Sequence, residues 1–114
     1  MRELLRHTST GPPAPEGVDV GDMTARTRVG GLVIAYAVLV DASNACDAVD
    51  EVAVAAESWA SAADLLRARG YRRVPRRAVG DRVPDGAVEA AFARPGTVFR
   101  KRFMADTPWT PATG

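Results

Sequence analysis

The chain has 114 residues, a formal net charge of +1 and a single cysteine, Cys46, so it has no internal disulfide. Its hydrophobic fraction of 46% and charged fraction of 25% are those of an ordinary globular protein. The length predicts one domain that needs no disulfide or metal for stability. The longest apolar run, residues 32–40, is too short for a bilayer span, which needs about 20 residues. We therefore expect no membrane partner.

Charge is distributed unevenly along the chain. Residues 1–66 carry four basic and ten acidic side chains, a net of −6, whereas residues 67–114 carry eleven basic and four acidic, a net of +7. The two halves attract, which predicts that basic strands lie beside an acidic helix within one fold. The alternative is an exposed basic face that binds an anionic partner such as nucleic acid.

The N-terminal residues predict an arm. They include the sequence Gly-Pro-Pro-Ala-Pro-Glu-Gly, in which neither helix nor sheet persists. We predict a flexible arm over residues 1–27, a single α/β domain over 28–104 and an extended tail over 105–114. The expected location is intracellular (cytoplasmic) or within a viral particle. A translation start at Met23 would instead place an apolar segment before a small-residue cleavage site, Ser43-Asn44-Ala45, just before Cys46, and would give a secreted or lipoprotein form.

Within the domain, residues 32–40 are apolar on both faces and predict a central strand. Residues 45–69 contain no Gly or Pro and predict one long helix, which Gly70 would end in a left-handed conformation. Its buried seam is spaced alternately by four and three residues: Ala45, Val49, Val52, Ala56, Trp59, Ala63 and Leu66.

The remaining elements are shorter. Residues 71–79 predict an edge strand, because Pro75 lacks a ladder donor and arginines lie on both faces. Residues 85–93 predict a short helix and 97–104 a third strand. The expected fold class is α/β, an α+β two-layer sandwich. Its β-α-β-α-β core has a three-stranded sheet, one long and one short helix, and an extended arm and tail.

The chain has few residues suited to catalysis. The only histidine is His7, in the arm, and a Ser or Cys nucleophile needs a base that the scaffold holds. Zinc would need several more soft ligands than the chain has. We predict no catalytic residue, no metal site and no cofactor, and expect a protein that is not an enzyme.

One short motif points toward an enzyme. The run Leu39-Val40-Asp41-Ala42-Ser43-Asn44 places a carboxylate at the end of the apolar strand, where open α/β sheets bind ligands. It resembles the first motif of PIN and NYN-type ribonucleases. That resemblance implies Asp41 as a Mg²⁺ ligand with Asn44 as its companion. The alternative is that the hexapeptide caps the predicted helix.

Arginines are concentrated in residues 67–82, which hold seven in sixteen positions, and a second basic cluster spans 100–102. Guanidinium groups contact phosphate in pairs of hydrogen bonds, so these clusters predict a nucleic-acid site as one alternative. Its residues would be Arg72, Arg73, Arg76, Arg77, Arg100, Lys101 and Arg102. In the other interpretation the arginines protect the edge strand and pair with the acidic residues Asp50, Glu57 and Asp64.

The leading hypothesis is a non-enzymatic assembly or interaction protein. A helix of 25 residues would be about 37 Å long, enough to project from so small a domain and contact another subunit. The expected partners are protein subunits of a homo-oligomer or larger complex, such as a viral particle. The predicted interface consists of residues from the Pro-rich ends: Pro12, Pro13, Pro108, Trp109 and Pro111.

Overall fold

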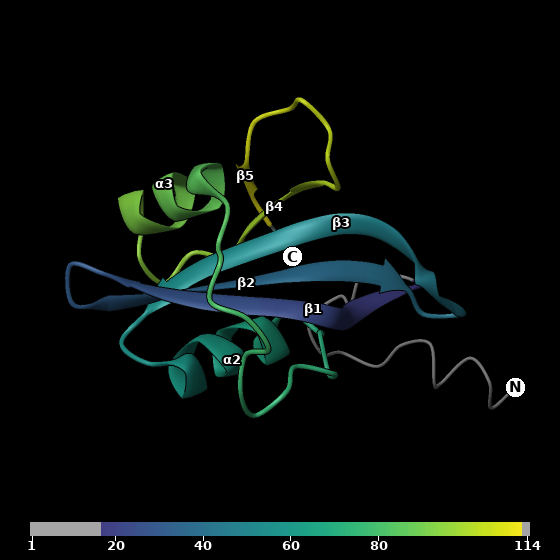
Figure 1. Ribbon diagram of the computed structural model, residues 1–114, viewed down its shortest axis with the longest axis horizontal. Helices are drawn as coiled ribbons and strands as arrows, with labels where there is room; N and C mark the ends of the chain where they lie inside the picture. The colour runs from purple at the N-terminus through teal and green to yellow at the C-terminus, as the bar shows by residue number, and fades with distance from the viewer. Residues whose placement is uncertain (1–16, 113–114) are drawn as a thin grey trace, which may run out of the picture.

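A computed structural model describes residues 17–112 of the chain (Figure 1). Its elements, in chain order, are β1 (Val18–Val29), β2 (Leu32–Asp41), β3 (Asn44–Ala56), α2 (Trp59–Ala68), α3 (Asp85–Ala93), β4 (Phe99–Arg102) and β5 (Thr110–Pro111). The strands form one antiparallel sheet in the order β1-β2-β3-β4-β5. Each strand therefore pairs with its neighbours in the sequence.

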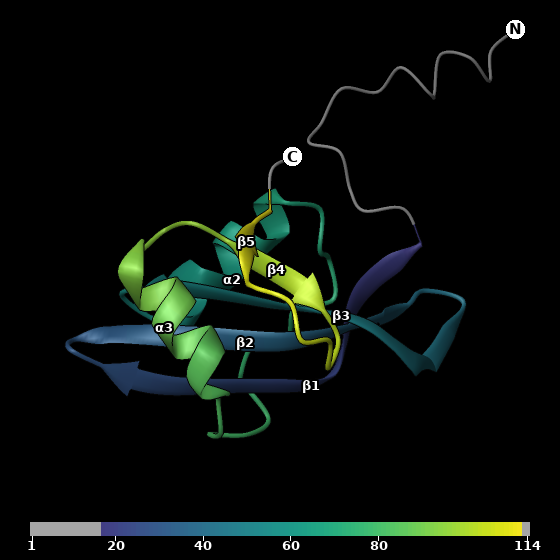
Figure 2. The same ribbon diagram turned by 90° about the horizontal axis from the view of Figure 1, so that it is seen from above.

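The two helices cover opposite faces of this sheet (Figures 1 and 2). Helix α2 buries Trp59 and Leu66 against one face, whose inward side chains include Ala35, Leu39 and Val54. Helix α3 packs its small buried residues, Ala87 and Ala91, on the other face, which presents mainly Ile34, Tyr36, Val38, Ala53 and Ala55. Because both faces are covered, β2 is apolar on both sides along nearly its whole length and β3 over residues 52–56.

The mixed α+β class is confirmed, but the expected architecture is not. The sheet has five strands where three were expected, and the helices on both faces make three layers where two were expected. The predicted central strand over 32–40 is confirmed as β2, and the predicted short helix over 85–93 is confirmed as α3. The third strand, expected over 97–104, is confirmed over its centre as β4.

The long helix predicted over 45–69 is wrong in its first half, which forms strand β3. Residues 52–56 are Val, Ala, Val, Ala and Ala, an apolar run that fits a helical seam and a two-sided strand equally well. The β-branched valines favour the strand, because its two faces are both buried. The helix begins only at Trp59, after the Ser58 hydroxyl accepts a hydrogen bond from the Ser61 amide at 3.1 Å.

The end of this helix is as predicted. Gly70 has φ +101°, and its amide donates to the carbonyl of Arg67 at 2.9 Å. The next amide, that of Tyr71, donates to the carbonyl of Leu66 at 3.2 Å. These two bonds form the Schellman motif that follows from glycine at this position.

Two other expectations are corrected. Residues 18–27, which were given to the arm, belong to strand β1, and Gly30 and Gly31, both with positive φ, make the tight turn into β2. Residues 71–79 do not form a strand, because arginines on both faces and Pro75 leave little that can be buried or paired. Within residues 17–112, no helix is both long and apolar enough to cross a membrane.

Candidate functional site

The connection between the two helices, residues 71–84, crosses the sheet at its β1 edge (Figures 1 and 2). We call this segment the strap. It leaves α2 on one face, passes along the outer side of β1 and reaches α3 on the other face. Hydrogen bonds to α2 and to β1 are the main contacts that fix its path beside Arg76 and Arg77.

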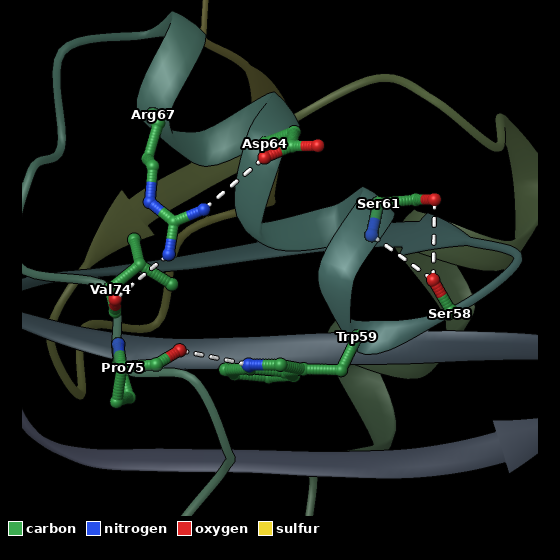
Figure 3. A network of polar contacts seen from close by, with 7 residues as sticks. All are labelled: Ser58, Trp59, Ser61, Asp64, Arg67, Val74 and Pro75. Carbon is green, nitrogen blue, oxygen red and sulfur yellow. Dashed lines mark hydrogen bonds and ion pairs between the residues drawn. The ribbon is translucent and has the colours of Figure 1, made fainter.

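The first attachment is to α2 (Figure 3). The indole Nε1 of Trp59 donates a hydrogen bond to the carbonyl of Pro75 at 3.0 Å. The guanidinium of Arg67 donates to the carbonyl of Val74 at 3.2 Å and to Asp64 Oδ1 at the same distance. Both carbonyls directly precede the exposed pair Arg76 and Arg77, so the bonds to helix α2 fix the backbone where that pair begins.

The second attachment is to β1. The amide of Gly80 donates to the carbonyl of Thr24 at 2.9 Å, and its carbonyl accepts from the amide of Arg26 at 3.2 Å. The amide of Val79 donates to the hydroxyl of the buried Thr24 at 3.0 Å. Gly80 thus forms a short parallel bridge on the outer edge of β1.

Two arginine-lined hollows lie along the strap and β1. The first, of about 240 Å³, is lined by Arg26, Trp59, Arg76, Arg77 and Ala78. The second, of about 380 Å³, is lined by Arg26, Thr27, Arg28, Val33 and Asp81. They share Arg26. We call the two together the arginine groove.

The arginines of this edge keep their charge available. Those of β1 and the strap are all exposed, and in the part of the chain that the structure describes none forms an ion pair: Arg26, Arg28, Arg72, Arg73, Arg76, Arg77 and Arg82. Four of these are predicted site residues: Arg72, Arg73, Arg76 and Arg77. Arg26 and Arg28 were not predicted, although they lie two apart and so share one face of a strand. This two-residue spacing is the sequence signal for an arginine-bearing strand face, but the segment was expected to form a flexible arm.

The second predicted basic cluster lies elsewhere. Arg100 projects toward α2, where its Nε donates to Asp50 Oδ2 at 2.8 Å and its Nη1 to the hydroxyl of Tyr71 at 3.3 Å. Lys101 projects to the opposite face and pairs with Glu51 Oε2 at 3.0 Å. Arg102, at the end of β4, is exposed. The structure does not bring this cluster to the arginine groove.

Acidic residues meet basic ones across strands β3 and β4. Of the expected acidic partners, Asp50 pairs with Arg100 of β4 and Asp64 with Arg67 of its own helix, while Glu57 is exposed. The attraction between the two halves of the chain therefore acts largely between neighbouring strands. It does not use the strap's arginines.

Two tyrosines complete these polar networks. The Tyr36 hydroxyl donates to Glu51 Oε1 at 2.8 Å, and burial, followed by the bond to this carboxylate and its charge, raises the pKa of Tyr36 above its usual value. Burial also raises the pKa of Tyr71, although the neighbouring Arg100 charge acts in the opposite direction. Tyr36, in β2, belongs to the core on the α3 face, and Tyr71, at the start of the strap, belongs to the core on the α2 face.

Asp41 is the last residue of β2, directly before the tight turn into β3. Its Oδ1 accepts hydrogen bonds from the amide and the hydroxyl of Ser43, and these two bonds lower the pKa of Asp41. Its motif forms a hairpin and caps no helix, so the expected capping role is wrong. Among residues 17–112, no three His, Cys, Asp or Glu side chains are placed to share a metal ion.

The predicted partner interface is only partly described. Trp109 folds back against the α3 face, half-buried, with Lys101 Nζ 5.9 Å from its ring centre. Pro108 and Pro111 are exposed, the latter in β5. Pro12 and Pro13 lie outside the described residues, as does His7. An interface at these positions stays a prediction.

A third hollow lies on the α3 face of the strap. It measures about 350 Å³ and is lined mainly by residues of β1 and the strap, with Tyr36 of β2. Two apolar side chains at this hollow are strongly exposed, Met23 at 62% and Val79 at 76%. Apolar exposure of this degree next to a hollow is a feature of contact surfaces.

Comparisons with known proteins found no matching protein-family model, no matching curated protein and no matching solved structure.

Proposed function

We propose that this protein is a non-enzymatic nucleic-acid-binding protein, and that the arginine groove is its binding site. The observation that carries the proposal is that Arg26 of β1 and Arg76 and Arg77 of the strap line one hollow, although some 50 residues of chain separate them. Arginine enrichment by itself would scatter these side chains over the surface. Convergence from two distant segments is a property of the fold.

The chemistry of the first hollow suits phosphate. None of its lining residues carries a carboxylate, and a guanidinium group offers several donors in a planar fork that matches phosphate oxygens. Exposed arginines also follow the strap on either side of the groove, at Arg72, Arg73 and Arg82. Such a row of cations is suited to the repeated charges of a nucleic-acid backbone.

The support for the arginines is rigid. The strap is fixed to α2 just before Arg76 and to β1 just after Ala78, by hydrogen bonds at both points. Arg26 projects from a paired strand. A site whose backbone is already ordered loses less conformational entropy when it binds than a flexible arginine-rich segment does.

The test measures the binding of labelled single-stranded and duplex oligonucleotides by fluorescence anisotropy over a series of salt concentrations. Affinity should fall steeply with salt, because each neutralised phosphate releases counterions, and Arg76→Ser or Arg77→Ser should each reduce the salt slope by about 1. The matched control is Arg94→Ser. Arg94 is exposed and directly follows α3, the helix that covers the face of the sheet opposite to α2. Absence of binding at about 50 mM salt, or equal effects of all three variants, would contradict the proposal.

A second candidate function is assembly with a protein partner, which Met23 and Val79 favour. Both side chains are largely exposed beside the third hollow. A second copy of the chain is the simplest partner to test. We expect sedimentation velocity to show concentration-dependent association that is weakened in a Met23→Ser, Val79→Ser double variant. A monomer at every concentration would contradict self-assembly.

A further inference from the structure

The two hollows of the arginine groove differ in chemistry. The first contains three arginines and no acid. The second is lined by Arg26 and Arg28 together with Thr27, the acidic Asp81 and the apolar Val33. A nucleotide has the same division, with a phosphate at one end and a sugar carrying hydroxyl donors and apolar carbons at the other.

We infer that the groove binds single-stranded RNA, with a phosphate in the first hollow, the adjoining ribose in the second, and the 2′-hydroxyl donating to Asp81. This inference rests on the proposed function and specifies its ligand. Arg26 lines both hollows, so it is placed at the junction between phosphate and sugar.

Asp81 is the residue that decides the ligand. A carboxylate accepts hydrogen bonds only and repels phosphate, so a groove built for phosphate alone gains nothing from one in its wall. A ribose hydroxyl is a donor that such a carboxylate can accept, and the 2′-hydroxyl is the group by which proteins distinguish RNA from DNA. The two arginines beside Asp81 keep the second hollow net positive, so the backbone is still attracted.

The shape of the groove favours a single strand. The second hollow brings Asp81 of the strap next to residues of β1 and Val33 of β2, so a ribose there has to reach Asp81 while its phosphate contacts Arg76 and Arg77 in the first hollow. A single strand can present its sugars and phosphates separately, whereas the sugars of a duplex are fixed within a stiff helix.

The experiment compares two oligomers of uridine that differ only in ribose or deoxyribose, against wild type, Asp81→Ala and Arg76→Ser. We expect wild type to prefer the ribose oligomer about tenfold, as a hydrogen bond to a charged group implies. Asp81→Ala should abolish the preference and leave affinity for the deoxyribose oligomer equal or higher. Arg76→Ser should weaken both oligomers by the same factor, because it acts on phosphate alone.

The outcomes separate the inference from the function on which it rests. Equal binding of the two oligomers by wild type, or a ribose preference that survives in Asp81→Ala, overturns the RNA assignment and leaves a nucleic-acid site. Stronger binding of duplex than of either single strand also overturns it. Absence of binding to every oligomer overturns both. Asp81 is exposed, so thermal denaturation should show that Asp81→Ala folds like wild type.

Discussion

Glu51 connects three separate parts of the chain through one carboxylate. It accepts hydrogen bonds from the Tyr36 hydroxyl at 2.8 Å and the Met104 amide at 3.0 Å, and it pairs with Lys101. The residue is only 5% exposed, so each partner offsets part of the cost of burying its charge. The same carboxylate raises the pKa of Tyr36.

The two tyrosines predict how stability depends on alkaline pH. Tyr36 and Tyr71 are the only tyrosines in the chain, and burial raises the pKa of both. A raised pKa means that the folded state holds these protons more tightly than the unfolded state does. The stabilisation is therefore fully present below about pH 10, the ordinary tyrosine value, and is lost as the pH rises above it.

The measurement is tyrosinate absorbance against pH for native and urea-unfolded protein. We expect the unfolded chain to ionise near pH 10 while the native protein does not, and the free energy of unfolding to fall above that pH. Glu51→Gln should move the native titration of one tyrosine toward lower pH, because it removes the neighbouring negative charge. Native titration that coincides with that of the unfolded chain would contradict the assignment.

At this scale the sequence predicted types of interaction but few partners. An acidic first half and a basic second half predicted attraction between the two, yet the partners Asp50 and Arg100 depend on the pairing of β3 with β4. That pairing is not encoded in any local sequence pattern. It could not be anticipated, because the residues of β3 were expected to form part of a helix. Arg76 and Arg77 were found as candidates because a run of arginines is visible in any conformation.

The elements show where periodicity stops being informative. Residues 45–56 are rich in Ala, which fits a helix, and their valines fit a strand, so the alternate spacing of four and three had no discriminating power. Tertiary burial on both faces decided the outcome. The helix terminus at Gly70 was predictable because a left-handed residue requires glycine locally, whatever packs around it.

Trp59 supports both its helix and the strap. It is 7% exposed at the start of α2, and its indole nitrogen bonds to Pro75. Trp59→Ala should lower the free energy of unfolding by about 3 to 5 kcal/mol, because it leaves a cavity in the core. Trp59→Phe keeps an aromatic ring there but loses the hydrogen bond, and should lose about 1 kcal/mol for that bond.

Urea unfolding followed by circular dichroism measures both variants. Equal losses would mean that packing contributes nothing beyond the hydrogen bond. Wild-type stability of Trp59→Ala would show that the indole is not part of the core.

For the whole molecule, the strap protects an edge of the sheet. Strand β1 is an outer strand of 12 residues, and such edges can pair with other chains. Gly80 bonds to the middle of this edge through both its amide and its carbonyl. The five-strand order could not be predicted, because β1 was expected in the arm, β3 in the long helix and β5 in the extended tail.

Replacing Gly80 tests this protection. Gly80→Pro removes the amide that donates to Thr24, so it should lower the free energy of unfolding by about 1 kcal/mol or more and promote association through the freed edge. Gly80→Ala is the matched control, because an added Cβ would come no closer than 3.7 Å to another residue and the amide stays. Unfolding in urea and sedimentation velocity give the two readouts, and identical behaviour of the variants would contradict an edge-protecting role.

The strap also has a consequence for the order of folding. Strands β1, β2 and β3 are joined by tight turns and pair with sequence neighbours, so their contacts form at low entropic cost. The bonds between Thr24 and Gly80 close a much longer loop. We expect the three-stranded meander to form first and the strap to close over it late. During synthesis, the nascent chain would then acquire its basic groove only after residues 71–84 had emerged and docked on a sheet already in place.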